Sequence, residues 1–355
     1  MSPQRILVIR RDNIGDLVCT TPFLHTLRQA FPAAHIAVLV NSYNRAVLWQ
    51  NTDVDEVISY DKLKHKNGIV AKTAALFSRI CLLIRLRRHR FDLTIIAKPS
   101  LDLHALRTAR WSGSKKILGF APSCEQAPRG LTDPVAANHP HLHEVEAVAQ
   151  LASHLGIAAK PGPLRLFPDP VLQARYRQPL KSNSRAQRWV ALHISAREKS
   201  RQWPAVKFIE LIKRLGGEAG LSDLGFVLLW SPGAANNPAH PGDDDKAEEI
   251  FEHTRQFPVL PLQTEHLEEL IAGLSVCDAF VGADGGAMHV AAGVGLPLVA
   301  LFENSQAKRE HWYPWQSTHR LLQPTSFPVA DIDVDSVVSA VRELIGTSQP
   351  SPNSR

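Results

Sequence analysis

The residues of this chain best suited to chemistry gather at one glycine-containing turn. An apolar strand is expected to run into Asp284, Gly285 and Gly286, and a short helix is expected to follow. Glycines at such a turn let backbone N–H groups approach a ligand closely, and the unpaired amides of a helix N-terminus favour a phosphate. The turn therefore predicts a site for a nucleotide diphosphate at Gly285 to Ala287, with His289 projecting from the first turns of the helix.

The same turn has a structural interpretation that the sequence leaves open. Strand–glycine–helix turns also occur without a ligand, and Gly285-Gly286 lacks the G-x-G-x-x-G spacing of a dinucleotide site. Asp284 would then be a helix cap, and His289 would be a structural histidine in a small, apolar helix.

A second strand-to-helix turn, at the N-terminus, also carries an aspartate. Residues 5–10 are expected to form a buried strand, residues 11–16 the turn and residues 17–31 a helix. In doubly wound sheets ligands bind beyond the carboxyl ends of the strands, which is where Asp16 and Asp284 would both lie. Asp16 is accordingly either a catalytic group at the ligand crevice or a cap of its helix, and the residues alone do not separate the two roles.

A cationic loop follows the strand expected at 189–194. Ser195, Lys199 and Arg201 stand between this strand and a helix that begins near Pro204. The hydroxyl and the cations stand where a diphosphate would approach, and arginine offers bidentate contacts to phosphate. A solvated surface loop is the other interpretation of these residues.

Motifs in order along the chain resemble those of the heptosyltransferases, glycosyltransferase family 9, which add heptose from ADP-heptose to the lipopolysaccharide core. They are R-x-D-x-I-G-D-x-V-x-T-T-P at 10–22, W-P at 203–204, and D-G-G-A-M-H at 284–289 followed by G-L-P-L-V-A-L-F. The resemblance spans nearly the whole chain, and the motifs are specific together although each is weak alone.

The resemblance implies an α/β protein of two facing Rossmann-like domains, the GT-B type of glycosyltransferase architecture. It implies a metal-independent, inverting transfer in which Asp16 takes the proton of the acceptor hydroxyl. The donor would be ADP-heptose, with no further cofactor and no metal ion. The implied donor-binding residues are Ser195, Lys199, Arg201, Asp284, Gly285, Gly286, Ala287 and His289, and Arg201 stands where the family often has a lysine that contacts the pyrophosphate.

The chain departs from the family pattern at two places. Residues 231–237 stand where relatives commonly place a glutamate that reads the donor ribose, so ribose recognition is unassigned. Glu303 stands where a glycine often follows the strand, and it either contacts the sugar or belongs to a loop.

Cations are concentrated in a segment of the first half. Between Lys62 and Phe91 there are nine lysines and arginines and no acidic residue, and residues 77–88 have the pattern of a basic amphipathic helix. Such a helix can lie on an anionic membrane or meet an anionic saccharide, or it can pack on a sheet with a solvated cationic face. The predicted partner is an anionic, lipid-linked saccharide, with Arg10, Asn13, Arg85 and Arg88 as candidate acceptor contacts. Nucleic acid is disfavoured, because aromatic residues are not interleaved and the net charge of +6 is modest.

The length and the composition of the chain predict two domains, since 355 residues with 44% hydrophobic content can bury two cores. The expected division is an acceptor-binding domain at 1–165, a linker at 166–188, a nucleotide-sugar-binding domain at 189–330, a helix at 331–346 and a disordered tail at 347–355. Further strands are expected near 35–40, 55–60, 92–97, 115–120, 225–230 and 298–302, and further helices at 142–155, 205–217, 245–255, 265–276 and 334–345.

The cysteines and the N-terminus indicate a cytoplasmic protein. Cys19, Cys81, Cys124 and Cys277 are far apart, which favours neither a zinc motif nor a disulfide framework. No signal-peptide pattern opens the sequence, and no apolar run has the length of a membrane span. The expected location is the cytoplasm, with peripheral contact to the inner membrane as an option.

Three other functions remain as alternatives. A glycosyltransferase that uses another nucleotide sugar would keep all of these motifs. A non-catalytic protein that binds a nucleotide sugar would keep residues 284–289 but could dispense with Asp16. An NAD-dependent oxidoreductase is disfavoured, because the turn after the first strand is R-R-D-N-I-G-D and lacks the glycine fingerprint.

Overall fold

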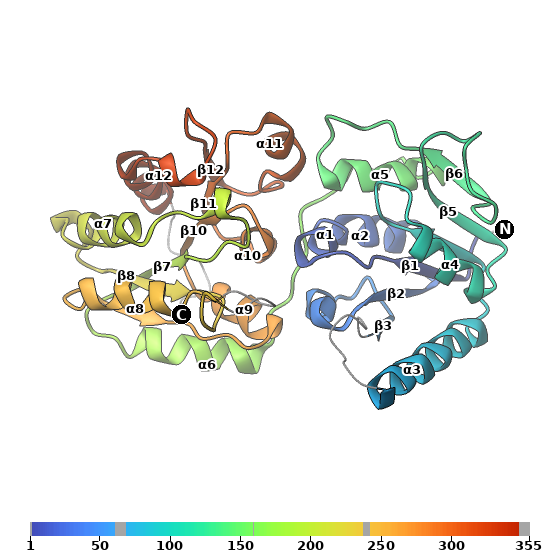
Figure 1. Ribbon diagram of the computed structural model, residues 1–355, viewed down its shortest axis with the longest axis horizontal. Helices are drawn as coiled ribbons and strands as arrows, with labels where there is room; N and C mark the ends of the chain where they lie inside the picture. The colour runs from blue at the N-terminus through green and yellow to red at the C-terminus, as the bar shows by residue number, and fades with distance from the viewer. Residues whose placement is uncertain (1, 61–68, 159, 237–241, 348–355) are drawn as a thin grey trace. The chain divides into compact units, whose positions relative to one another are not determined.

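The computed structural model describes residues 2–60, 69–158, 160–236 and 242–347, apart from the side chains of residues 69–76 and 347. The chain divides into two compact units, Met1–Phe167 and Pro168–Arg355. Each unit has its own parallel sheet with helices on both faces (Figure 1).

The first unit is built on a six-stranded sheet in the order β3-β2-β1-β4-β5-β6, and its neighbouring strands are parallel. The strands are β1 (Arg5–Ile9), β2 (His35–Asn41), β3 (Glu56–Tyr60), β4 (Leu93–Ile96), β5 (Lys116–Ala121) and β6 (Asp133–Ala136). This is the Rossmann strand order, in which the order reverses next to β1. The carboxyl end of β1 is therefore the place where such a sheet binds a ligand.

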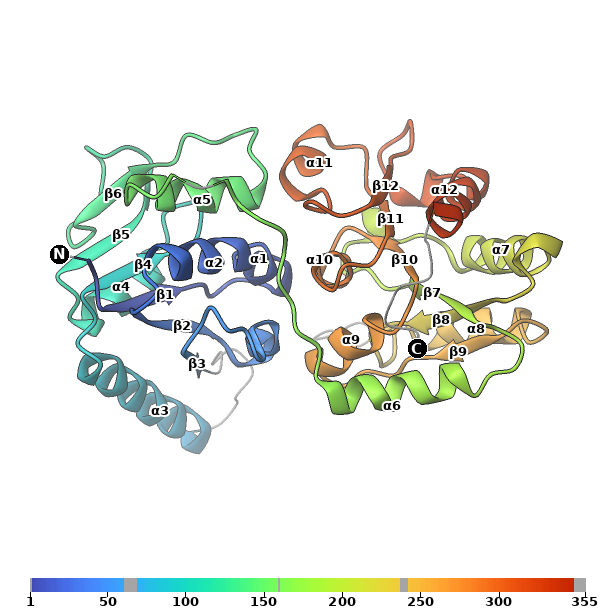
Figure 2. The ribbon, with the colours of Figure 1, turned by 180° about the vertical axis from the view of Figure 1, so that it is seen from behind.

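Helices cover both faces of the first sheet. They are α1 (Ile14–Val18), α2 (Thr21–Ala30), α3 (Ile69–Arg88), α4 (Leu103–Ser112) and α5 (Glu144–His154), with the 3₁₀ helix η1 (Ser42–Leu48) after β2. Helices α2 and α5 pack together on one face, which Figure 2 shows from behind. Helices α3 and α4 cover the other face, where Leu39 and Ile58 are buried against Leu86 and Ala109.

The second unit repeats this architecture with the order β12-β11-β10-β7-β8-β9. Its strands are β7 (Arg188–His193), β8 (Leu224–Leu229), β9 (Val259–Pro261), β10 (Ala279–Ala283), β11 (Leu298–Leu301) and β12 (His319–Leu322). Its helices are α6 (Pro170–Lys181), α7 (Ala205–Gly216), α8 (Asp244–His253), α9 (Leu267–Leu274), α10 (Gly286–Gly293), α11 (Gln306–Trp312) and α12 (Val334–Thr347), with the 3₁₀ helices η3 (Lys199–Arg201), η4 (Ala219–Leu221) and η5 (Val329–Asp331).

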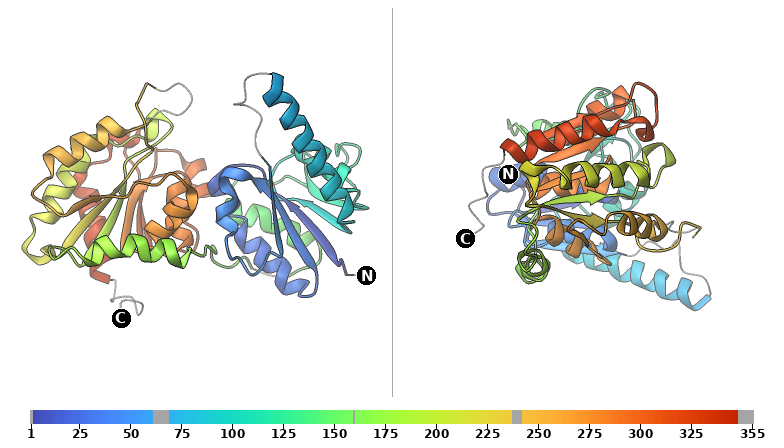
Figure 3. Two further views of the ribbon diagram at one scale, coloured as in Figure 1. Left: turned by 90° about the horizontal axis from the view of Figure 1, so that it is seen from below. Right: turned by 90° about the vertical axis from the view of Figure 1, so that its left-hand side faces the viewer.

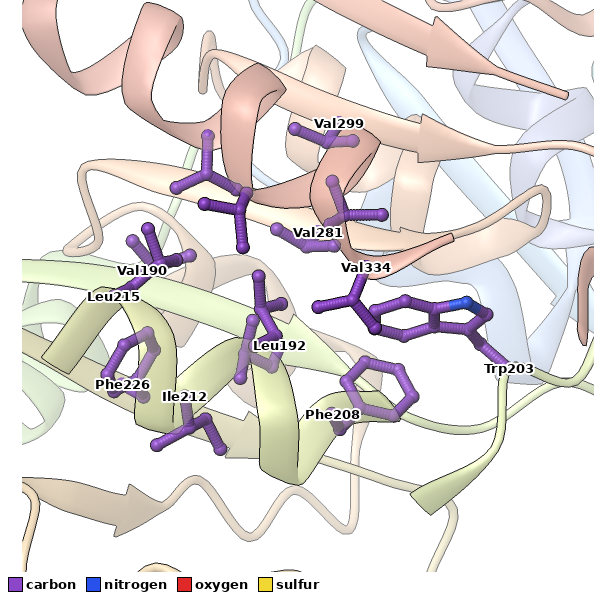
Figure 4. Packing of buried hydrophobic residues seen from close by; sticks show 14 of the residues in the cluster. Val190, Leu192, Trp203, Phe208, Ile212, Leu215, Phe226, Val281, Val299 and Val334 are labelled. Carbon is purple, nitrogen blue, oxygen red and sulfur yellow. The ribbon is translucent and has the colours of Figure 1, made fainter. Parts of the chain in front are cut away.

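The core of the second unit lies between its sheet and helices α7, α8 and α12 (Figure 4). Val190, Leu192 and Val281 of the central strands pack against Phe208 of α7. Trp203 is 2% exposed, stacks edge-on against Phe208 with ring centroids 4.8 Å apart, and donates its indole N–H to Ile332 O at 3.0 Å. A buried tryptophan with its polar atom satisfied fixes the end of the cationic loop that precedes it.

The expected order of strands and helices is confirmed, and most ends agree within two residues. One helix is expected at 17–31, but two are found, α1 and α2, with a break at Cys19 and Thr20. Pro22 has no N–H to continue a helix and is favoured in the first turn of a new one, where it is found. Asp16 consequently lies inside α1 and not ahead of the helix.

Three strands, β6, β9 and β12, were not expected from the sequence. Each has three or four residues and lies at the edge of its sheet. Pro134 and Pro261 fall within two of them, and proline is tolerated only at such edges. Short, partly exposed strands lack both the apolar run and the alternation by which strands are recognised.

The segment expected as a linker, 166–188, contains helix α6. Asp169 caps this helix by accepting hydrogen bonds from Val171 N and Leu172 N, and Pro170 occupies its first position. Gln173 of α6 donates to Ser275 Oγ at 3.1 Å, which fixes α6 against the end of α9. The tail expected to be disordered lies, beyond Thr347, outside the described residues. Among the described residues, no helix is both long and apolar enough to cross a membrane.

Candidate active site

Asp16 lies at the carboxyl end of β1, in the first turn of α1. Its Oδ2 accepts a hydrogen bond from Asn13 N at 3.1 Å, in a capping box with Asn13. Its Oδ1 accepts one from Arg10 Nη2 at 2.9 Å. The side chain is 19% exposed, so a ligand can reach the carboxylate. Asp16 thus stabilises its helix, and its carboxylate is partly exposed, so the catalytic role stays a prediction.

Arg10 anchors this carboxylate from below. It follows β1, is 1% exposed, and donates to Ala97 O and to Glu144 Oε1 as well as to Asp16. Asp12 Oδ2 lies 3.4 Å from Arg10 Nε, and Lys98 Nζ lies 3.3 Å from the other oxygen of Asp12. Three carboxylates therefore surround one buried guanidinium.

The surroundings of Asp16 raise its pKa above the ordinary aspartate value. Burial is the largest cause, Arg10 lowers the pKa in part, and the charges of Asp12 and Glu144 raise it. A carboxylate with a raised pKa is a stronger base than an ordinary aspartate, which suits proton abstraction near neutral pH.

Side chains from β2 and η1 hold the turn between β1 and α1. Asn41 donates to Arg11 O, and Tyr43 Oη donates to Asp12 O at 2.6 Å. Asn44, which is fully buried, donates to Asp12 O at 3.3 Å. These supporting residues lie about 30 positions away in the sequence and belong to no motif, so no pattern in the sequence marks them.

The second candidate cluster lies at the turn between β10 and α10. Gly285 is the N-cap residue of α10, so Asp284 does not cap this helix as one interpretation expected. Asp284 is 8% exposed, and Ala287 and His289 are 7% and 2% exposed. The ring of His289 lies edge-on to Trp312 of α11, with centroids 5.6 Å apart. The helix begins without a side-chain cap, which leaves its first amides for a ligand.

The cationic loop after β7 meets this turn through Arg201. Arg201 Nη1 lies 3.2 Å from Asp284 Oδ2 and donates to Asp284 O at 3.4 Å, although 83 positions separate the two residues. Ser195 is buried, and its Oγ accepts a hydrogen bond from Ser231 N at 2.8 Å. Lys199 is exposed in the same loop. The structure therefore joins the cationic loop to the turn at Asp284 through Arg201, while Ser195 contacts Ser231 and no contact with the turn is seen for Lys199 among the described residues.

Two further charged residues complete this cluster. Glu303 is 1% exposed, accepts a hydrogen bond from Ser200 Oγ at 2.9 Å and lies 3.7 Å from Arg201 Nε. Lys308 of α11 donates to Glu303 and lies 3.6 Å from Glu198. The sequence offers Glu303 as a possible contact to the sugar, but no pattern marks Lys308, which stands alone in a polar helix.

Burial raises the pKa of Asp284 to about 6, against the opposing charges of Arg201 and Lys308. Asp284 thus titrates closer to neutral pH than an ordinary aspartate. The ion pair with Arg201 is complete only above this pH, where the carboxylate carries its charge.

Lys246 of α8 fixes both ends of the cationic loop. Its Nζ donates to Ile194 O and to Trp203 O, each at 2.7 Å. Burial lowers the pKa of Lys246 to about 8. Ser195, Lys199 and Arg201 all lie between these two anchored carbonyls, so Lys246 is a positioning residue that the sequence did not reveal.

Gly285→Ala should weaken ADP binding without unfolding the protein. The backbone of Gly285 is extended, and an added Cβ would meet only Ala283 O, at 3.9 Å, so the protein itself tolerates a methyl group. A methyl group in the path of the predicted diphosphate should cost one charge-assisted hydrogen bond, about 1.5–3 kcal/mol, or roughly 10–100-fold in Kd. Isothermal titration with ADP measures this change.

Gly282→Ala is the matched control for Gly285→Ala. An added Cβ at Gly282 would lie 2.6 Å from Phe280 Cζ, so this variant should lose melting temperature. Equal ADP affinity in Gly285→Ala and wild type would contradict a diphosphate at this turn.

The candidate acceptor residues fall in two places within the first unit. Arg10 and Asn13 adjoin Asp16 at the carboxyl end of β1. Arg85 instead pairs with Glu56, the first residue of β3, at 2.6 Å, and Arg88 is exposed at the end of α3. Because the strands are parallel, the start of β3 lies at the opposite end of the sheet from Asp16, and the structure does not bring these two pairs together.

A family model described as glycosyltransferase family 9 (heptosyltransferase) matches residues 79–327. A related protein, lipopolysaccharide heptosyltransferase 3 of Escherichia coli, is 23% identical over 323 residues, which are 85% of this chain and 84% of that protein. The crystal structure of a family 9 glycosyl transferase from Veillonella parvula has a TM-score of 0.80 at 20% identity and covers 97% of this chain and 98% of that one. The structure of ADP-heptose lps heptosyltransferase II of E. coli has a TM-score of 0.75 at 21% identity, covering 96% and 98%. The expected fold class, α/β with two Rossmann-like units of GT-B type, is confirmed.

Proposed function

This chain belongs to glycosyltransferase family 9, the heptosyltransferases, and on that premise we propose that it moves heptose from ADP-heptose to a lipopolysaccharide core acceptor with inversion at the anomeric carbon. The observation that carries the proposal is the ion pair between Arg201 and Asp284. It joins the cationic loop to a helix N-terminus, and the two together suit a nucleotide diphosphate.

In the proposed reaction the acceptor oxygen forms a bond to the anomeric carbon while the bond from that carbon to the diphosphate breaks. The hydroxyl proton passes to the Asp16 carboxylate, and the electron pair leaves with ADP. The second unit binds the donor, and the first unit binds the acceptor.

The leaving diphosphate would be stabilised by Lys199, by Arg201 and by the amides at the start of α10. Lys199 is exposed, so its ammonium group is accessible to a phosphate. Arg201 instead lies beside three carboxylates, those of Asp284, Glu198 and Glu303. The Ser195 hydroxyl, whose oxygen accepts from Ser231 N, keeps its hydrogen for a phosphate oxygen. These groups supply the positive charge and the donors that a leaving phosphate requires.

Arg10 takes a different role from the acceptor contact expected of it. A guanidinium that is 1% exposed and bonded to Asp16, Glu144 and Ala97 O orients the base and does not reach a sugar. We therefore propose Arg10 as a positioning residue, while Asn13, next to Asp16 at the carboxyl end of β1, remains the proposed acceptor contact.

A panel of nucleotides tests the donor. ADP-heptose and ADP should raise the melting temperature at concentrations where UDP-sugars and NAD do not, because a ligand that binds only the folded chain stabilises it. Transfer should then be measured with ADP-heptose and a lipid-linked core acceptor. Equal stabilisation by UDP-sugars would favour another nucleotide sugar, and binding of ADP-heptose without transfer would favour a non-catalytic binding protein.

Helix α3 offers a surface for the membrane that carries a lipid-linked acceptor. Phe77, Ile80 and Ile84 are 68%, 45% and 47% exposed and follow the i, i+3, i+7 spacing of one helix face. Exposed Arg87 and Arg88 flank this apolar stripe. An apolar stripe between cations is typical of a helix that lies on an anionic lipid surface. We therefore propose that α3 contacts anionic phospholipids.

Reversing Arg87 and Arg88 to Glu should weaken binding to phosphatidylglycerol vesicles by at least ~30-fold at low salt, since each cation near such a surface contributes about 1 kcal/mol. Arg85 is left unchanged, because it pairs with Glu56 and its loss would also disturb the fold. Wild-type binding should fall steeply with ionic strength. Vesicle co-sedimentation measures both effects.

The same charge change at exposed Lys181 and Lys213, in the second unit, is the control and should leave vesicle binding nearly unchanged. Ile80→Ser with Ile84→Ser should weaken binding without altering charge. Salt-independent binding, or equal loss in the control, would assign α3 to an ordinary solvated face.

A further inference from the structure

Two histidines and a glutamate cluster in the first unit, at the end of the sheet opposite to the proposed base. His35 and Glu56 are the first residues of β2 and β3, and His89 follows the last residue of α3. Ala37 is the register partner of Glu56, so His35, two residues earlier, points to the same sheet face. Helix α3 covers that face, as Figure 3 shows from below, and it brings His89 to the other two side chains.

Two distances within this cluster are those of neighbouring ligands around one metal ion. Glu56 Oε2 lies 3.3 Å from His35 Nε2 and 3.5 Å from His89 Nε2, and the three ligand atoms lie within 4.8 Å of one another. With zinc–ligand bonds of about 2.0–2.2 Å, neighbouring atoms of a tetrahedral site are about 3.3–3.6 Å apart. Both distances from the carboxylate oxygen match an edge of such a tetrahedron.

Hydrogen bonds alone account less well for this arrangement. Good N–H···O bonds measure about 2.7–3.2 Å, whereas Glu56 Oε2 makes only a long hydrogen bond with His35 Nε2, at 3.3 Å, and lies 3.5 Å from His89 Nε2. Both rings turn Nε2 toward Glu56, and since they are stacked with 9° between their planes, a small rotation of one ring would bring one ion into both ring planes. The side chains of His35, Glu56 and His89 are 36%, 19% and 21% exposed, which leaves an entry path and room for a water ligand.

We propose that His35, Glu56 and His89 bind one zinc ion through two Nε2 atoms and one carboxylate oxygen, with water as the fourth ligand. Two neutral imidazoles and a carboxylate are a donor set that zinc prefers. The site lies at the amino ends of β2 and β3, whereas ligands of such sheets bind at the carboxyl ends. The ion would join the end of α3 to two strands and should therefore stabilise the first unit.

Neighbouring groups orient the proposed ligands. Arg85 Nη2 lies 2.6 Å from Glu56 Oε1, the oxygen that does not face the histidines, and so directs Oε2 toward them. Arg5 donates to His89 O at 3.0 Å and fixes the backbone of that ligand. Outer contacts of this kind hold ligating side chains in place. Arg85 also brings a positive charge near the ion, but its side chain is 54% exposed and its charge is screened by water.

The test uses the full chain without a polyhistidine tag, in a background of Cys81→Ser and Cys124→Ser, because these two cysteines are exposed and free. After chelation and dialysis, titration with zinc chloride should show one ion per chain with a Kd of about 1 µM or tighter. Cobalt(II) in place of zinc should give the intense visible bands of a tetrahedral ion. The melting temperature should rise with zinc and return with chelator.

His35→Ala and His89→Ala should each weaken zinc binding by ~100-fold or more, and Glu56→Gln by at least ~10-fold. His154→Ala is the matched control, because His154 pairs with one carboxylate only, Asp133, at 2.7 Å, and its loss should change nothing. Zinc affinity equal in wild type and the His35→Ala, His89→Ala double variant would overturn the proposal, as would a six-coordinate cobalt spectrum. If a histidine variant fails to fold, the proposal is tested by the zinc affinity of Glu56→Gln and by the cobalt spectrum of the wild type.

Discussion

Asp16→Asn is expected to lower the rate of heptosyl transfer by about 10²–10⁴ and to leave ADP binding unchanged, since removal of a general base has that scale of effect. The variant should remain folded. Asp16 receives hydrogen bonds from Asn13 N and Arg10 Nη2 on different oxygens, and an asparagine keeps only one acceptor oxygen, so one of the two bonds is lost and a modest decrease in melting temperature is expected. Steady-state kinetics with a saturating donor, together with ADP titration, measure the two quantities.

The pH dependence of transfer distinguishes a base from a helix cap. Burial raises the pKa of Asp16, and the charge of Arg10 offsets this only in part. A base must be deprotonated, so kcat/KM of the wild type should fall as pH is lowered through a value above the ordinary aspartate pKa. Asp16→Asn should lack this acid limb. Transfer within about threefold of wild type would mean that Asp16 is only a cap.

Much of the fold could be predicted from the sequence because its central strands are buried on both faces. Residues 5–10 and 189–194 form apolar runs that end at polar turns, and a parallel sheet produces that pattern. The edge strands β6, β9 and β12 are short and half exposed, so no comparable signal marks them. Helix α6 carried a readable signal in Asp169 and Pro170, but the polar, proline-containing segment around it outweighed that signal.

The positions of the turns that carry Asp16 and Asp284 could also be predicted, because each turn follows the carboxyl end of an apolar parallel strand in its own sheet. The partners of their aspartates could not. Glu144 meets Arg10 from 134 positions away, and Lys308 joins the Arg201 cluster from another helix. Such ion pairs depend on how the helices pack, and the spacing of residues along the sequence does not reveal them.

The acceptor contacts were the least predictable part of the site. Arg85 and Arg88 belong to the cationic segment between Lys62 and Phe91, and Arg10 to the motif at 10–22, yet Arg85 pairs with Glu56 at the far end of the sheet. Arg10 is a fully buried cation, and a buried arginine looks the same in sequence as an exposed one. Burial separates Arg10 from these two arginines, and the strand register places Arg85 at the other end of the sheet.

Substituting Arg10 is expected to have the second-largest effect, on stability and on catalysis together. Arg10→Met removes the cation between Asp16 and Glu144 and leaves their carboxylates without it, at a cost of about 3–5 kcal/mol. The pKa of Asp16 should rise further, because the charge that lowers it is gone. The acid limb of kcat/KM should therefore move to higher pH, and chemical denaturation should show the loss of stability.

Glu144→Gln should shift the acid limb in the opposite direction, because the charge of Glu144 raises the pKa of Asp16. Arg10→Lys keeps the charge but loses the planar fork, so it should restore most of the pH profile and only part of the rate.

Arg28→Met, which breaks the ion pair with Asp55 in the same unit, is the control and should leave the pH profile in place. The acid limb of kcat/KM could instead be the same in wild type, Glu144→Gln and Arg10→Lys, with each loss of rate matched by a loss of stability. That result would mean that Arg10 has only a structural role. If the acid limb moves to higher pH in Arg10→Met and to lower pH in Glu144→Gln, the buried charges set the pKa of Asp16. A purely structural role of Arg10 does not predict these opposite shifts.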